Sequence, residues 1–139
     1  MSTRNLALRH TIRKATIKDC GLINRLAWKA FPPTYQAILT PEQIEYMMHW
    51  MYDEASLRRQ MTKEGHVYFI IHVEGEPAGY VSVRPEDAGV FHLEKIYVLP
   101  DFQGCHCGSA LFRHAVAYVR RVCPCLLYTS PSPRDGLLS

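Results

Sequence analysis

The sequence has no long hydrophobic run. Its 139 residues are 47% hydrophobic and 21% charged, but no stretch approaches the roughly 20 apolar residues that a membrane-spanning helix needs. The opening residues, MSTRNLALRH, lack the apolar segment of a secretory signal peptide. These absences lead us to expect one cytoplasmic domain, since a chain of this length can bury one hydrophobic core.

Clusters of basic residues are also missing. The net charge is +3, and the lysines and arginines are scattered rather than gathered in a run or interleaved with aromatic residues. A nucleic-acid-binding surface is typically marked by such clustering, so we expect neither a nucleic acid nor a membrane as a partner. In the cytoplasm the five cysteines are expected to be free thiols rather than a disulfide framework.

The most informative stretch runs from residue 91 to residue 121. It predicts a strand that ends at Leu99-Pro100, a loop that contains Gly104 and Gly108, and then an amphipathic helix. Such an arrangement suits a phosphate, because the N–H groups of the loop and of the helix N-terminus converge on one anion. It is not a P-loop, since no Lys-Ser/Thr pair follows Gly108, and the dinucleotide spacing is absent.

The remaining elements follow from periodicity and from residues that begin or end helices. We expect strands at 11–16, 66–74, 78–84 and 90–99, the last three as an antiparallel meander. Helices are expected to begin at Thr16-x-x-Asp19, Thr40-Pro41 and Asp53, and Pro32-Pro33 is expected to end the first of them. The apolar face of the final helix is expected to comprise Leu111, Phe112, Ala115, Val116 and Val119.

One string in this stretch is more specific than its glycines. Ile96-Tyr97-Val98-Leu99-Pro100, followed by Gln103-Gly104 and Gly108-Ser109-Ala110-Leu111, resembles the central motif of the GCN5-related N-acetyltransferases. The loop pattern of that family is Gln/Arg-x-x-Gly-x-Gly/Ala, and Gln103 and Gly108 match it. His106 occupies the position of the middle glycine. If the backbone there needs a positive φ, the histidine is strained.

The resemblance covers roughly residues 11–121 and implies an α/β fold with the mixed sheet of the acyl-CoA N-acyltransferases. Its parts are a strand, two or three helices, an antiparallel meander and a central helix, without the family's final strands and helix. It implies acetyl-CoA as cosubstrate, no metal, and direct transfer of the acetyl group to a primary amine of a small molecule or peptide. The implied cofactor-binding residues are Ile96, Tyr97, Val98, Gln103, Gly104, Cys105, His106, Cys107, Gly108 and Ser109.

Two residues on the strand before the loop are candidates for the catalytic base. His92 and Glu94 alternate with Leu93, so both should point to one face of the strand. Either side chain can accept a proton near neutral pH when its surroundings shift its pKa. In the alternative interpretation, Glu94 forms an ion pair with Lys95 or Arg84, or is only solvated. The general acid of the family is expected in a C-terminal part that this sequence lacks.

Other interpretations stay open at this point. Tyr35 either contacts the acceptor or packs as a half-buried residue. The protein is either an enzyme or a non-catalytic module that binds coenzyme A or another protein, and a homodimer is left open. Cys105-His106-Cys107 also suggests a small metal or redox site, because Cys107 near a helix N-terminus could have a lowered pKa.

The last fifteen residues, CLLYTSPSPRDGLLS, differ from the rest. They resemble the conceptual translation of a sequencing-library adapter. We therefore expect a lead-in over 1–10, a partial N-acetyltransferase domain over 11–124, and a non-native or disordered tail over 125–139. Within that tail, the β-propensity of Leu126 to Thr129 predicts a strand beside Glu94 to Val98.

Overall fold

In the computed structural model of the chain, residues 9–86 and 90–122 are described in full and residues 126–129 by their backbone. The expected lead-in, the turn near 87–89 and nearly all of the expected tail lie outside these ranges. Five strands form one sheet in the order β1-β2-β3-β4-β5. The strands are β1 (His10–Lys14), β2 (Val67–Val73), β3 (Glu76–Pro85), β4 (Val90–Val98) and β5 (Leu126–Thr129).

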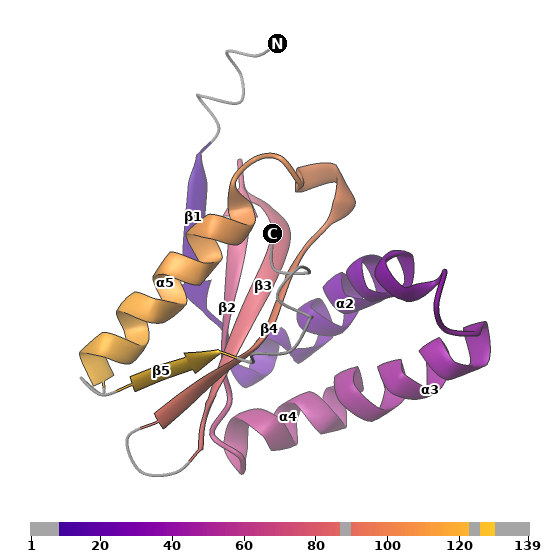
Figure 1. Cartoon of the computed structure of the whole chain (residues 1–139), viewed down its shortest axis with the longest axis horizontal. Helices are drawn as coiled ribbons and strands as arrows, with labels where there is room; N and C mark the ends of the chain where they lie inside the picture. The colour runs from indigo at the N-terminus through magenta and orange to yellow at the C-terminus, as the bar shows by residue number, and fades with distance from the viewer. Residues whose placement is uncertain (1–8, 87–89, 123–125, 130–139) are drawn as a thin grey trace.

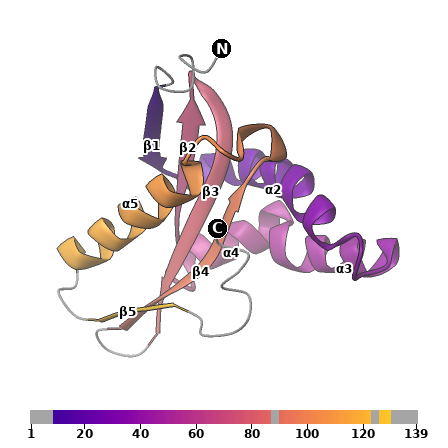
Figure 2. The same cartoon turned by 45° about the horizontal axis from the view of Figure 1, so that its top comes forward.

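Helices cover both faces of this sheet. Figure 1 shows α5 (Cys107–Val122) across one face, whereas α2 (Cys20–Tyr35), α3 (Pro41–Tyr52) and α4 (Glu54–Thr62) lie on the other. The turned view in Figure 2 shows the same two layers. Short 3-10 turns, η1 (Ile17–Asp19) and η2 (Pro100–Phe102), precede α2 and follow β4. The predicted order of strand, helices, meander and helix is thus confirmed.

Two helix starts have the capping chemistry that the sequence predicts. The Thr40 hydroxyl accepts a bond from the Gln43 N–H at 3.1 Å, and the Gln43 side chain accepts one from the Thr40 N–H at 2.9 Å. Thr16 and Asp19 form the equivalent capping box, although it opens η1 rather than α2. Asp53 precedes α4 as expected, but its side chain makes no cap bond there. Its Oδ1 instead lies 2.9 Å from Nδ1 of His49.

The prediction that Pro32-Pro33 ends the first helix is wrong. Helix α2 continues through both prolines to Tyr35. The Gln36 N–H donates to the Pro32 carbonyl at 2.8 Å, and the Thr34 hydroxyl donates to the Ala30 carbonyl at 2.8 Å, so the last turn is well bonded. Burial of Phe31 in the core also holds the helix in place, and tertiary packing of this kind overrides local propensity.

Each face of the sheet has its own hydrophobic core. The core under α5 includes Leu111, Ala115 and Val119, which confirms three of the five residues predicted for its sheet-facing side. On the opposite face, α2 to α4 pack on a core rich in tyrosine, and Tyr52, Tyr68 and Tyr80 are fully buried there. Within the part of the chain that the structure describes, no helix combines the length and the apolar character needed to cross a bilayer.

Strand β4 contains an irregularity that matters for the site. Ser82 pairs with Lys95 and Val83 pairs with Leu93, so Glu94 is an extra residue in β4, a β-bulge. Strand β5 runs parallel to β4, as predicted, but it pairs with Val90 to Leu93 rather than with Glu94 to Val98. The predicted register is therefore wrong, because β5 pairs with the regular part of β4 and ends where the bulge begins.

Candidate functional site

The loop between β4 and α5 has the backbone conformation that its glycines suggest. Gly104 has a φ of 90°, and His106 has a φ of 62°. The left-handed region is accessible to glycine but costs roughly 1–2 kcal/mol for other residues. The position of the expected middle glycine therefore does require a positive φ, and His106 adopts it under strain.

Free backbone donors gather at the start of α5. The Ala110 N–H donates to the His106 carbonyl at 3.1 Å. The N–H groups of Cys107, Gly108 and Ser109, which precede it, have no acceptor among the described residues. No acidic side chain lies in the first turn of the helix. These N–H groups and the positive end of the helix dipole together favour an anion.

A hollow of about 550 Å³ lies over these donors. Its volume falls within the range of small-molecule sites. The hollow brings together all of the predicted cofactor-binding residues except Cys105. They come from the end of β4, from the loop and from the first turn of α5. The lining residues are Thr34, Ile96, Tyr97, Val98, Phe102, Gln103, Gly104, His106, Cys107, Gly108, Ser109, Phe112 and Arg113.

Two of the lining residues on α5 were not predicted to be there. Phe112 was expected to face the sheet, but it is 38% exposed and forms part of the wall of the hollow. Arg113 is exposed and adds a positive charge. Both follow Ser109 at the spacing of one helical turn. That spacing was the available sequence signal for their place beside the loop.

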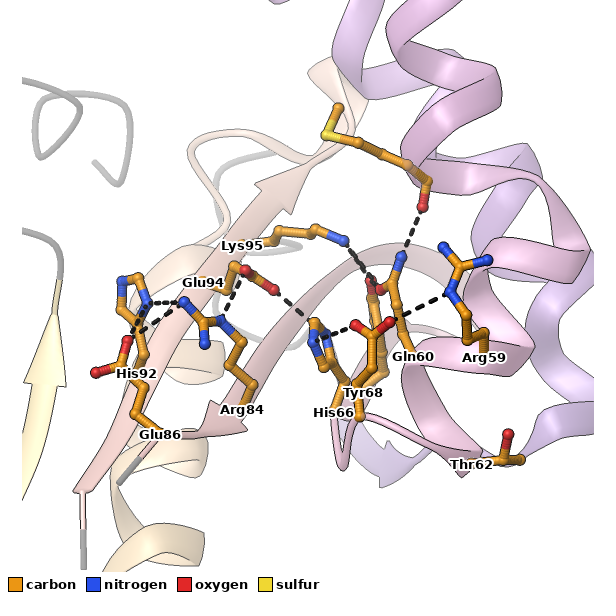
Figure 3. A network of polar contacts seen from close by, with 12 residues as sticks. Arg59, Gln60, Thr62, His66, Tyr68, Arg84, Glu86, His92, Glu94 and Lys95 are labelled. Carbon is orange, nitrogen blue, oxygen red and sulfur yellow. Dashed lines mark hydrogen bonds and ion pairs between the residues drawn. The ribbon is translucent and has the colours of Figure 1, made fainter. Parts of the chain in front are cut away.

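The candidate bases do point to one side of β4, as predicted. Figure 3 shows His92 and Glu94 on either side of Arg84, which comes from β3. Nε of Arg84 donates to Oε2 of Glu94 at 3.0 Å, and its Nη2 lies 3.3 Å from Nδ1 of His92. The structure therefore contains the ion pair between Glu94 and Arg84 that the alternative interpretation predicts. Neither His92 nor Glu94 lines the hollow.

His66, just before β2, extends this network and was not predicted. Its Nδ1 lies 3.3 Å from Oε1 of Glu94, and its Nε2 lies 3.5 Å from Oε1 of Glu64. Burial lowers the pKa of His66, although the two carboxylates oppose that effect. Both carboxylate oxygens of Glu94 thus face a nitrogen, Oε2 that of Arg84 and Oε1 that of His66. The lowered pKa of His66 favours its neutral form.

Lys95, also in β4, lies on the same side and ends in an unusual environment. Its Nζ donates to the Tyr68 hydroxyl at 2.6 Å and to Oε1 of Gln60 at 3.2 Å (Figure 3). The ammonium also lies 4.8 Å from the centre of the Tyr52 ring. Burial lowers the pKa of Lys95 to about 8, while nearby Glu94 opposes this. No local sequence pattern could reveal these contacts, because the hydrogen bonds join α4, β2 and β4, and the Tyr52 ring comes from α3.

Tyr35 packs rather than lining the hollow. Its ring lies 4.5 Å from that of Phe31, and its hydroxyl lies 3.4 Å from the hydroxyl of Tyr97. The side chain is half-buried, its contact with an acceptor amine stays a prediction, and Tyr97 joins Tyr35 to the strand that borders the hollow.

Cys107 is not an activated thiol. It is buried, and burial raises its pKa to about 11, with Cys105 adding to the effect. The expectation of a lowered pKa at the helix N-terminus is therefore wrong, because burial disfavours the charged thiolate. Among the described residues, no three histidine, cysteine or acidic side chains are placed to hold a metal ion. Cys123 and Cys125 lie outside the described ranges.

A curated N-acetyltransferase is similar to this chain in sequence. An uncharacterised N-acetyltransferase of Methanocaldococcus jannaschii is 25% identical over an alignment of 128 residues, and the match covers 87% of this chain and 53% of that protein. The chain thus spans about half the length of this curated relative.

Two solved structures share the fold. The PaiA N-acetyltransferase of Thermoplasma acidophilum, in complex with coenzyme A, superposes with a TM-score of 0.78 at 19% identity. The match covers 93% of this chain and 84% of that one. A GCN5-related N-acetyltransferase of Rhodopseudomonas palustris gives a TM-score of 0.73 at 20% identity, over 91% and 76% of the two chains. The sequence profile of the acetyltransferase (GNAT) family matches residues 22–133. The chain therefore belongs to the GNAT acetyltransferase family.

Proposed function

We propose that this chain binds acetyl-CoA in the hollow over the start of α5 and transfers the acetyl group to a primary amine of a small molecule or peptide. The observation that carries the proposal is the set of N–H groups at Cys107, Gly108 and Ser109 that have no acceptor in the described part of the chain, in a hollow that the motif residues line. Such donors suit the diphosphate of coenzyme A. Arg113 would add a cation to the same contact.

The end of β4 is the proposed seat for the acyl arm of the cosubstrate. Ile96, Tyr97 and Val98 line the hollow. Among the described residues, β5 pairs only with Val90 to Leu93. Within the described ranges β5 thus stops short of the part of β4 beyond Glu94, and we place the cosubstrate at that part of the strand. Backbone N–H groups in such a position can stabilise the negative charge that develops on a thioester oxygen.

The chemistry is a direct attack of the amine on the thioester carbonyl with both substrates bound. An ammonium group cannot attack, so a base must accept its proton. We propose Glu94, and after it His92, for this role. Glu94 stands at the bulge, next to the proposed seat, with Oε1 near His66 and Oε2 held by Arg84. The hydrogen bond from Arg84 fixes the orientation of the carboxylate.

A second candidate function is a module that binds coenzyme A without transferring an acetyl group. The strain at His106 and the ion pair between Glu94 and Arg84 favour it. Both weaken features on which efficient transfer depends, namely the phosphate loop and a free base. Binding and turnover must therefore be measured separately.

The test starts with calorimetric titration of the chain with coenzyme A. Ser109→Glu places a carboxylate in the hollow while favouring the helix start, so it should abolish binding without unfolding the protein. Ala117→Glu makes a similar change in charge at an exposed position of α5 that does not line the hollow, and it should bind normally. Equal binding by the two variants would refute the proposed cofactor site.

Turnover is then measured with acetyl-CoA and a panel of amino acids, polyamines and lysine peptides. Product mass and released thiol are both recorded. We expect Glu94→Gln to slow transfer more than His92→Ala at neutral pH. Binding of coenzyme A without turnover on any amine would support the non-catalytic alternative, and unchanged rates in both variants would remove the assigned bases.

A further inference from the structure

The outer face of α3 exposes large aromatic side chains. Tyr46 is 71% exposed and Trp50 is 64% exposed, and the two are one helical turn apart. Trp28 of α2 is 39% exposed and meets the same helix at His49, with the two ring centres 6.4 Å apart. Clustered exposed aromatic rings typically mark a binding surface.

Folding does not account for this exposure. The opposite side of α3 carries Ile44, Met48 and Tyr52, which are buried in the tyrosine-rich core. That inner side already anchors the helix. The outer rings therefore contribute little to packing within the described part of the chain, and their presence on the surface calls for another explanation.

The charge of this region is one-sided. Residues 41–57 contain four acidic side chains and no lysine or arginine, in a chain whose net charge is +3. Glu42, Glu45 and Asp53 recur at the spacing of the outer side, together with Tyr46 and Trp50. Glu42 and Glu45 lie on this face of α3, and Asp53 is the C-cap of the helix. None of the three carboxylates bonds to a lysine or arginine among the described residues.

We propose that Trp28 and the outer face of α3, formed by Glu42, Glu45, Tyr46, His49, Trp50 and Asp53, dock an arginine- and lysine-rich segment of another protein. Guanidinium and ammonium groups stack on tryptophan and tyrosine rings. They also pair with carboxylates, and arginine does so in a bidentate manner. Alternating acidic and aromatic side chains along one helical face offer both contacts to an extended basic segment.

This surface is separate from the proposed cofactor site. None of its residues lines the hollow over α5. Docking a basic segment should therefore leave coenzyme A binding unchanged. The inference does not depend on acetyl transfer. A peptide with arginine and blocked ends contains no primary amine, so it cannot serve as an acceptor in the proposed reaction, and its binding reports on this surface independently of that reaction.

The probe is a dodecapeptide of alternating arginine and glycine, acetylated and amidated at its ends. Trp28 and Trp50 are the only tryptophans in the sequence, so intrinsic tryptophan fluorescence reports on this surface alone. We expect a saturable change in fluorescence on titration, and weaker binding as the salt concentration rises. A dodecapeptide of alternating glutamate and glycine should produce no change.

Matched variants test the assignment. Glu42→Gln, Glu45→Gln and Asp53→Asn together should weaken binding at least about tenfold, since several charge contacts are lost. Glu74→Gln, Glu76→Gln and Asp101→Asn remove the same charge from other exposed positions and should change the affinity less than about twofold. Trp50→Ala should weaken binding while leaving Trp28 as the reporter. If the triple variant unfolds, Glu42→Gln with Glu45→Gln replaces it.

Three results would overturn the proposal. One is the absence of any saturable change with the folded protein at low salt. Another is equal weakening by the triple variant and its control, which would indicate a general effect of net charge. The third is concentration-dependent dimerisation that the triple variant abolishes, since the surface would then bind a second copy of the chain.

Discussion

The backbone of Gly79 in β3 lies directly against the backbone of Tyr97 in β4. A Cβ added to Gly79 would overlap the Tyr97 carbonyl oxygen and come within 3.1 Å of the Val98 Cα. This contact brings β3 close to the segment of β4 that borders the hollow. Glycine is needed at this position because any side chain would force the two strands apart.

Gly79→Ala should therefore destabilise the protein and displace the end of β4. We expect the free energy of unfolding to fall by about 2 kcal/mol or more, in the range of overpacking mutations. Chemical denaturation provides the measurement. The control is Gly21→Ala in α2, where an added Cβ would lie 3.4 Å from Oε2 at the flexible end of the Glu54 side chain. That variant should be neutral or up to about 1 kcal/mol more stable.

The strain at His106 predicts a ranking of substitutions. His106→Gly should be neutral or stabilising by up to about 1 kcal/mol, because relief of strain is partly offset by the flexibility of the unfolded chain. His106→Val should be destabilising, since a β-branched residue tolerates a positive φ poorly. Chemical denaturation should rank the stability of the three proteins as glycine variant, wild type, valine variant, from highest to lowest. Calorimetry should rank their affinity for coenzyme A in the same order. A valine variant as stable and as tight-binding as the glycine variant would contradict the account of this loop.

Lys95 predicts a dependence of stability on pH. Its pKa in the folded protein is about 8, below its ordinary value, so between pH 8 and pH 10 the unfolded chain holds more protons at this residue. The contribution of Lys95 to the free energy of unfolding should therefore rise with pH, by about 2 kcal/mol over this range.

The measurement compares wild type with Lys95→Met. Burial raises the pKa of Cys107 and of the core tyrosines, and these groups act in the opposite direction as the pH rises. Both proteins contain them, so only the difference between wild type and variant is informative. The free energy of unfolding of the wild type minus that of Lys95→Met should increase from pH 8 to pH 10. The same comparison for exposed Lys63→Met controls for the loss of one lysine, and a flat difference for Lys95 would refute the prediction.

Arg113 should contribute to binding of the proposed cosubstrate. Arg113→Gln removes its charge from the hollow and should weaken coenzyme A binding roughly three- to tenfold, as expected for one partly exposed phosphate contact. The same change at Arg120, exposed on α5 and not among the residues lining the hollow, is the matched control. Calorimetry at two salt concentrations distinguishes a specific contact of Arg113 from a general effect of net charge. Equal loss of coenzyme A affinity in the two variants would argue against a specific contact.

Local signals in the sequence predicted much of the fold. The Thr40 cap with Pro41, the meander and the loop around Gly104 were all visible as short patterns with a known backbone consequence. The motif also identified most residues of the hollow. Pro32-Pro33 misled because burial of Phe31 and bonding in the last turn outweigh the cost of the prolines.

Long-range contacts account for the rest. The bulge at Glu94 and the register of β5 depend on how three strands pair, and no single segment encodes that pairing. The environment of Lys95 likewise joins α4, β2 and β4. Cys107 is a further example. Its position at the helix N-terminus predicts a lowered pKa for the thiol, whereas its burial, which depends on tertiary packing, raises that pKa.

Hydrogen exchange at the start of α5 tests the central claim most directly. With saturating coenzyme A, the amides of Cys107, Gly108 and Ser109 should exchange markedly more slowly than in the free protein, because the diphosphate would supply acceptors that these amides do not find among the described residues. Unchanged exchange of these amides with bound coenzyme A, or protection only elsewhere in the chain, would contradict the proposed site.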